Sequence, residues 1–183
     1  MILTGPEIIH QHEAGRIALE PFCIEQVNPN SYNYRLGPVL RTHRGPVIDA
    51  LGEHPVREIT IPDEGVVLRP GQVYLGTTVE RIGSDHYVPS LIGRSSLGRL
   101  GVYLQVSADL GNLGAVHRWT LEIVVCQAVR VYAGMIVGQV SFWIPSGDRL
   151  PYDGHFGRFS EAVTPYPDLL TAGRRPARRG ARR

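Results

Sequence analysis

The sequence predicts a mainly β fold in a single domain, an all-β barrel or jelly roll. Three observations support this class. The chain has 183 residues, of which 43% are hydrophobic, enough for one domain with a substantial core. Its 21 glycines and 14 prolines interrupt it at short intervals, as in strands joined by turns. The apolar residues recur in short runs, with no long helical pattern between them.

The predicted elements follow from these patterns in chain order. Residues 5–14 form a short helix, because Pro6 stands early in the segment and Gly15 just beyond it. Residues 43–57 are expected to be irregular, and a helical turn is expected from Ser95 to Leu100. Alternating apolar and polar residues, bounded by turn-forming residues, predict strands over residues 16–20, 31–36, 58–61, 66–68, 73–79, 102–107, 119–126 and 135–143.

The charge is distributed unevenly along the chain. The formal net charge is +2, but six of the 19 basic residues lie in the last ten positions, which leaves the rest of the chain at about −4. A basic surface for nucleic acid is therefore not indicated outside that Arg-rich tail. We expect a domain over residues 1–170 and a basic, disordered tail over residues 171–183, which has no apolar residue larger than Ala.

Cysteine content and hydropathy indicate a cytoplasmic protein. Cys23 and Cys126 provide neither a disulfide framework nor a metal quartet, and the chain has no C-x-x-C pair. The N-terminus lacks a signal-peptide pattern, and no apolar run approaches the roughly 20 residues that a membrane span needs.

The segment with the clearest chemical content is GRSSLGRLGV, residues 93–102. It places two hydroxyls and two guanidinium groups at a predicted helix start, where free backbone N–H groups attract phosphate. Arg99 lies four positions after Ser95, on the same helical face. On residue types alone, an ordinary capped turn with solvated arginines explains the segment equally well.

This segment closely resembles the GRSSLARLG motif of the dCTP deaminase family in the dUTPase-like superfamily. Residues 31–37 are similar to the family's S-x-D-x-R-L-G segment, and residues 134–142 resemble its G-M-x-I-G-x-x-x-F strand. The likeness begins with the N-terminal residues 1–22 and covers residues 1–143. It implies a dUTPase-like distorted β-barrel with a short N-terminal helix and one short helix after residue 94.

The resemblance also implies roles for individual residues. Glu122 stands where the family keeps its catalytic acid and base, although strand alternation alone would favour an outward-facing surface residue. Ser95 and Arg99 would orient the water and stabilise developing charge, as catalytic partners of Glu122. The substrate-binding residues implied by the match are Arg94, Ser95, Ser96, Arg99, Ala108, Asn112, Phe156 and Arg158.

The implied reaction is hydrolytic deamination of dCTP to dUTP and ammonia. The family works without a catalytic metal, with Mg²⁺ as the companion of the triphosphate, and its sites lie between the subunits of a homotrimer. A zinc-dependent route would need a P-C-x-x-C pair, which this chain lacks. Two alternatives stay open: a dUTP diphosphatase, and a pyrimidine nucleotide-binding protein without catalytic activity.

The chain departs from the family's H-R-I-D-P-G-W segment at residues 109–115. The family's Arg, Asp and aromatic residue are replaced by Leu110, Asn112 and Ala115. An Asn can bind a sugar hydroxyl but cannot act as a base, so a diphosphatase activity, alone or as a second activity, is disfavoured. The pair His117 and Arg118 is a candidate substitute for the lost Arg, with a surface-exposed pair as the alternative.

Overall fold

The computed structural model describes residues 1–49, 52, 55–105 and 109–149. Within these residues the protein is mainly β, as predicted, with two α-helices and one 3₁₀ turn, η1 (Ile24–Gln26). The helices are α1 (Gly5–Glu13) and α2 (Ser95–Gly98). The strands are β1 (Ala18–Glu20), β2 (Tyr32–Arg35), β3 (Val39–His43), β4 (Val56–Thr60), β5 (Val66–Leu68), β6 (Tyr74–Gly83), β7 (Val88–Gly93), β8 (Val102–Leu104), β9 (His117–Val125), β10 (Val129–Val131) and β11 (Ile136–Trp143).

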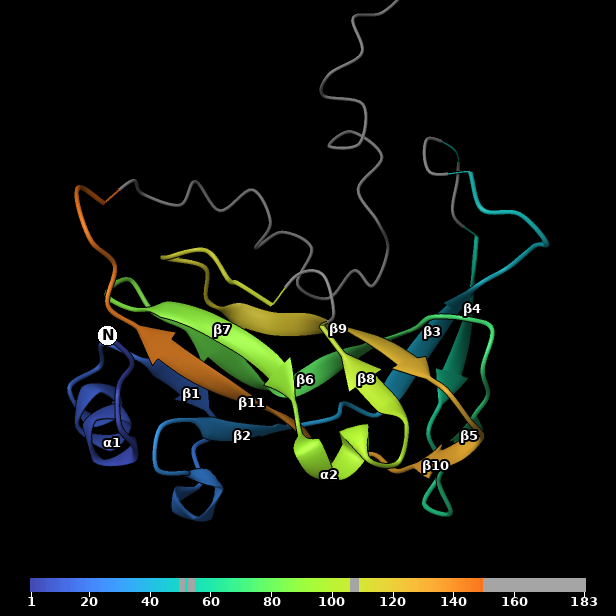
Figure 1. The fold of residues 1–183 in the computed structure, drawn as a ribbon, viewed down its shortest axis with the longest axis horizontal. Coiled ribbons are helices and arrows are strands. Elements are labelled where there is room, and N and C mark those ends of the chain that lie inside the picture. Colours follow the sequence, from blue (N-terminus) through green and yellow to red (C-terminus); the bar gives the residue numbers. More distant parts are fainter. Residues whose placement is uncertain (50–51, 53–54, 106–108, 150–183) are drawn as a thin grey trace, which may run out of the picture.

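The strands form two main sheets, and the strand pairs are antiparallel. The larger sheet has the order β4-β3-β6-β9-β8, and β1 also pairs with β6. The second sheet has the order β2-β11-β7, and β5 pairs separately with β10. In Figure 1, β7 and β11 cross in front of β6 and β9, so the two sheets stack as layers.

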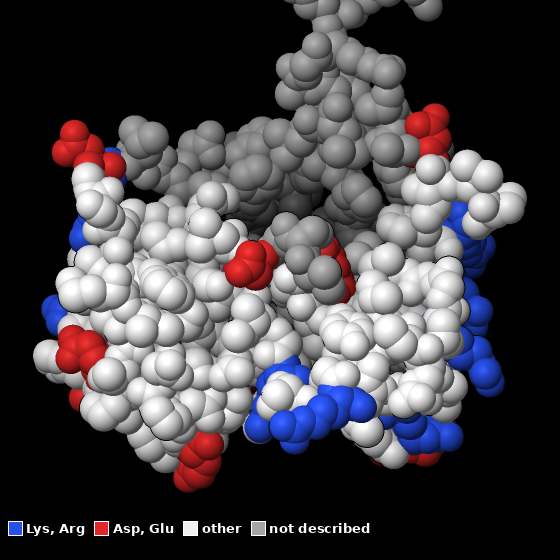
Figure 2. Space-filling view, in the orientation of Figure 1, with Lys and Arg blue, Asp and Glu red and all other residues white. Residues whose placement is uncertain are grey.

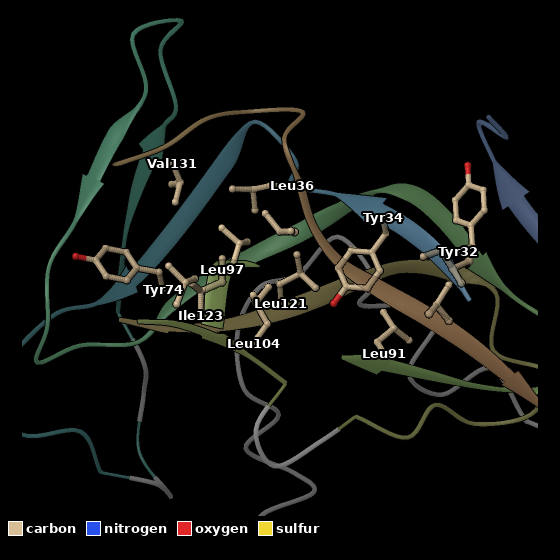
Figure 3. Packing of buried hydrophobic residues seen from close by; sticks show 14 of the residues in the cluster. Tyr32, Tyr34, Leu36, Tyr74, Leu91, Leu97, Leu104, Leu121, Ile123 and Val131 are labelled. Carbon is tan, nitrogen blue, oxygen red and sulfur yellow. The ribbon is translucent and has the colours of Figure 1, made fainter. Parts of the chain in front are cut away.

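The core lies between these layers. Tyr32, Tyr34 and Phe142 are among its largest fully buried side chains. Figure 3 shows Tyr34, Leu91 and Leu121 side by side, although they come from β2, β7 and β9. The Tyr34 hydroxyl donates to the Ile92 carbonyl oxygen at 2.9 Å and so also joins the two outer strands of the second sheet.

A β-bulge interrupts the pairing of β6 with β9, and a buried charged side chain lies within it. The register between β6 and β9 shifts between Thr77 and Arg81. Glu80, within this irregular stretch, is fully buried and forms an ion pair with Arg35 at 2.6 Å. Thr78 lies in the same stretch, and its hydroxyl oxygen accepts a hydrogen bond from the Trp119 backbone N–H at 2.9 Å. The bulge thus bonds β6 to β2 and β9 through side chains where the regular ladder is interrupted.

The structure corrects the predicted elements at several points. Sequence analysis predicted no strand at β3, β7 or β10, and the irregular stretch expected over 43–57 ends where β4 begins at Val56. β7 was missed because Pro89 lies within it, and proline is tolerated in a sheet only at an edge. β7 is such an edge strand of the β2-β11-β7 sheet. β6 is longer than predicted and ends at Gly83, and β8 ends at Leu104.

No helix among the described residues is both long and apolar enough to cross a membrane. Residues 150–183, which include the predicted tail and the boundary predicted at residue 170, lie outside the described part of the chain.

Candidate active site

The predicted phosphate-binding segment sits on α2, directly after β7. Arg94 has extended backbone angles, φ −117° and ψ 143°, and the helix begins at Ser95. Leu97 points into the core and fixes the orientation of the helix. Ser95, Ser96 and Arg99 are therefore left exposed, and Arg94 is half-buried. Figure 2 shows blue basic atoms gathered at the position that α2 takes in Figure 1, so this surface is positively charged.

Glu122 lies in the middle of β9 and faces away from the core. Its neighbours Leu121 and Ile123 are buried in the core cluster, so alternation directs Glu122 to the opposite face. The side chain is half-buried there. Within the described residues, its carboxylate makes no hydrogen bond or ion pair with another side chain. A half-buried carboxylate without such a partner is available to a substrate.

Gln105 connects Glu122 to the end of β8. The Glu122 backbone N–H donates to the Gln105 side-chain Oε1 at 2.8 Å. Gln105 is buried and has a positive φ of 52°. This left-handed conformation costs a non-glycine residue about 1–3 kcal/mol, which the surrounding contacts must offset.

Two threonines share the face of the sheet on which Glu122 lies. The β6–β9 register pairs Leu75 with Glu122 and Thr77 with Thr120. Directly opposed residues in a sheet project to the same side, so these four side chains occupy one face. Neither threonine was among the site residues predicted from the sequence. Thr120 was detectable, since it stands two positions before Glu122 in a predicted strand, but the pairing of Thr77 was not.

The segment that carries Asn112 is held between β7 and β9. The Leu91 backbone N–H donates to the Asp109 carbonyl oxygen at 2.7 Å, and the Gly111 N–H donates to the Pro89 carbonyl oxygen at 2.7 Å. A Cβ on Gly111 would lie 2.5 Å from the Trp119 ring, so the chain packs directly on that indole. Asn112 itself is exposed. Its side chain is therefore free to meet a ligand from solvent.

His117 packs against an aromatic side chain of the same strand. Its ring is tilted against that of Trp119, with a centroid distance of 4.2 Å. Burial lowers the pKa of His117 below its usual value of 6.5, and the nearby Arg81 charge lowers it further, against a hydrogen bond with the Arg118 carbonyl that raises it. The uncharged form of the imidazole is therefore favoured. Arg118 is exposed, and its Nε donates to the Val79 carbonyl oxygen at 3.1 Å.

Within one chain, the phosphate-binding segment begins beside Leu104, which pairs with Ile123 next to Glu122, and it ends toward Cys126. Just after α2, the Gly101 carbonyl oxygen accepts the Cys126 backbone N–H at 2.8 Å. Cys126 is four residues beyond Glu122, a separation of about 13 Å along an extended strand. Ala108, Phe156 and Arg158, also predicted to bind substrate, lie outside the described residues.

A profile of the dCTP deaminase-like family matches residues 2–144, which is most of the chain. The chain belongs to the dCTP deaminase-like family. The family resemblance drawn from the GRSSLGRLGV segment is thereby confirmed.

Characterised relatives of similar length are dCTP deaminases. A protein named "dCTP deaminase, dUMP-forming" from Hathewaya histolytica is 39% identical over 170 residues, covering 93% of this chain and 97% of the relative. One with the same name from Clostridium botulinum (strain Alaska E43 / Type E3) is 41% identical over 170 residues, covering 93% and 96%. A "dCTP deaminase" from Rhodopirellula baltica is 41% identical over 149 residues, covering 81% and 74%. The chain is therefore an enzyme of this kind.

A solved structure confirms the fold class. The 2'-deoxycytidine 5'-triphosphate deaminase from Agrobacterium tumefaciens matches with a TM-score of 0.63 and 22% sequence identity. The match covers 87% of this chain but 52% of the other, so this chain spans about half the length of that protein. The fold is the predicted dUTPase-like β structure.

Proposed function

We propose that this protein hydrolyses dCTP to dUMP, with Glu122 as the acid and base of the deamination step. The observation that carries this proposal is the half-buried Glu122 carboxylate, which has no side-chain partner among the described residues. It lies in a chain that is 39% identical over 93% of its length to a dUMP-forming dCTP deaminase.

The deamination step needs one group that moves a proton twice. Glu122 takes a proton from water as the water oxygen bonds to C4 of the cytosine, and this proton passes to N3. The carboxylate then takes the remaining proton from the C4 hydroxyl and gives it to the amino group. The C4–N bond breaks as the C4 carbonyl forms, and the amino group leaves as ammonia. A positioned acid–base group typically contributes a factor of about 10²–10⁴ to such a rate.

The proposed end product, dUMP, differs from the dUTP that was expected from the sequence. Formation of dUMP needs a second water to attack the α-phosphorus, with pyrophosphate as the leaving group. The names of the relatives favour dUMP. Asn112 favours a second candidate, a deaminase that stops at dUTP, because an amide cannot take a proton from that second water.

The triphosphate is proposed to bind at α2 as its Mg²⁺ complex, the metal being part of the substrate. Exposed Ser95, Ser96 and Arg99, with Arg94 at the helix start, present hydroxyl and guanidinium donors to phosphate oxygens. No group of three or more His, Cys, Asp or Glu side chains placed to hold a metal ion is found in the described residues.

The complete site is proposed to form between subunits of a homotrimer. The support is the resemblance to the dCTP deaminase family, whose sites lie between the subunits of a homotrimer. Light scattering should give about three times the 20.2 kDa chain mass. A monomer that turns over dCTP would contradict the shared site.

The deaminase proposal is tested by incubating pure protein with dCTP and Mg²⁺ and measuring ammonia, dUTP, dUMP and pyrophosphate. Ammonia with pyrophosphate supports the dUMP-forming enzyme, whereas ammonia with dUTP supports the second candidate. Glu122→Gln should abolish ammonia release and still be stabilised against heat by dCTP. Glu58→Gln is the matched control, since Glu58 is an exposed strand residue on the same sheet. Absence of ammonia with the unmodified protein would leave only nucleotide binding.

A further inference from the structure

The face of the sheet around Glu122 combines an apolar centre with a polar rim. Leu75 pairs with Glu122 across β6 and β9, so it lies on the same face. It is only 7% exposed, yet it does not belong to the core cluster on the other side of the sheet. Leu75 is thus covered by the chain, and Glu122 is the accessible, polar member of this pair.

The polar rim is completed by Thr77 and Thr120. These residues oppose each other one pleat away from the Leu75–Glu122 pair. Both are half-buried, and neither hydroxyl makes a hydrogen bond within the described part of the chain. Thr77 is the diagonal neighbour of Glu122, and such neighbours are about 7–8 Å apart. This spacing leaves room for a pyrimidine ring between the carboxylate and the hydroxyl.

Gly37 fixes the place of the Thr77 side chain. The Gly37 backbone N–H donates to the Thr77 carbonyl oxygen at 2.7 Å. A Cβ on Gly37 would lie 2.6 Å from the Thr77 Oγ1, so the hydroxyl occupies the space that a larger residue would fill. The Gly37 backbone does not have a positive φ. Glycine is therefore needed here for space, and the space it leaves is taken by the Thr77 hydroxyl.

From this arrangement we propose that Thr77 is a substrate-positioning residue, whose hydroxyl hydrogen-bonds the polar edge of the pyrimidine base. This inference rests on the proposed deaminase function of the same site. The base is thus held from two strands: Glu122 on β9 faces the reacting carbon, and Thr77 on β6 holds the ring in register with it.

The test compares three substitutions at position 77 by steady-state kinetics with dCTP. Thr77→Val keeps the side-chain shape and removes the hydroxyl, so KM should rise about tenfold, as for the loss of one neutral hydrogen bond, while kcat stays within about threefold. Thr77→Ser restores the hydroxyl and should return KM to within about twofold of the original. Thr77→Ala also removes the hydroxyl, without adding atoms, and should raise KM by the same factor. The test therefore does not depend on whether the valine variant folds.

The matched control is Thr60→Val, an exposed threonine on β4 that lies two strands from β6. It should change neither kinetic constant. Unchanged KM in both Thr77→Val and Thr77→Ala would overturn the inference, as would a Thr77→Ser variant as impaired as the valine. These outcomes differ from failure of the proposed function, in which the unmodified protein releases no ammonia from dCTP.

Discussion

Replacing Glu80 by alanine should destabilise the fold more than any change to a surface ion pair. The fully buried carboxylate accepts three hydrogen bonds: from the Arg35 Nε at 2.6 Å, from the Arg35 backbone N–H at 2.8 Å and from the Gln26 side chain at 3.2 Å. Alanine removes both acceptor oxygens, and with them all three hydrogen bonds, and leaves the Arg35 charge without its partner. The hydrogen bond to Glu80 also raises the pKa of Arg35, so that charge remains.

The magnitude follows from the burial of the two partners. Breaking a buried ion pair by removing one member costs about 3–5 kcal/mol. The Arg35 side chain is 29% exposed and keeps part of its hydration, so the lower end, about 3 kcal/mol, is expected. With a urea dependence of about 2 kcal/mol per molar, the unfolding midpoint should fall by about 1.5 M.

The assay is urea unfolding followed by circular dichroism, with Glu58→Ala as the matched control. Glu58 pairs with Arg41 at 3.0 Å, but its side chain is 55% exposed, and an exposed pair contributes at most about 1 kcal/mol. Glu80→Gln, which keeps the shape and one acceptor oxygen, should fall between the two. If Glu80→Ala shifts the midpoint no more than Glu58→Ala, the reasoning about the buried network is wrong.

Three further predictions concern packing and pH. Gly138→Ala should lower the free energy of unfolding by about 1–3 kcal/mol, because the new Cβ would overlap the Tyr34 ring and lie 2.5 Å from the Ile92 carbonyl oxygen. An unchanged melting temperature would contradict this packing. Gly98→Ala, by contrast, should stabilise α2 by about 0.5–1 kcal/mol in the same melting assay, since nothing lies within 4 Å of the added Cβ and the position lacks a positive φ. Burial raises the pKa of Tyr32 from 10 to about 12. Its contribution to the free energy of unfolding should therefore be fully present below pH 10 and be lost as pH rises toward 12. Measuring the free energy of unfolding against pH for the original protein and for Tyr32→Phe tests this, and the loss should be smaller in the variant.

Local sequence patterns identified most of the elements that carry the site. The helix at Gly5–Glu13 and the strands around Tyr32, Val66 and Ile136 were predicted close to their observed bounds because each combines clear periodicity with glycine or proline at its ends. Where the pattern was contradictory, prediction failed. β7 contains Pro89, and only the position of that strand at a sheet edge explains why proline is accommodated.

The chemical groups of this protein could be identified along the chain: the hydroxyls and guanidiniums at residues 94–99, the carboxylate of Glu122 and the family to which they point. That Glu122 faces away from the core, and that Thr77 shares its face, was established by the folded structure. The reason is physical. Alternation along a strand offers two faces without saying which is buried, and the pairing of β6 with β9 depends on long-range register, which a slip of one residue would reverse.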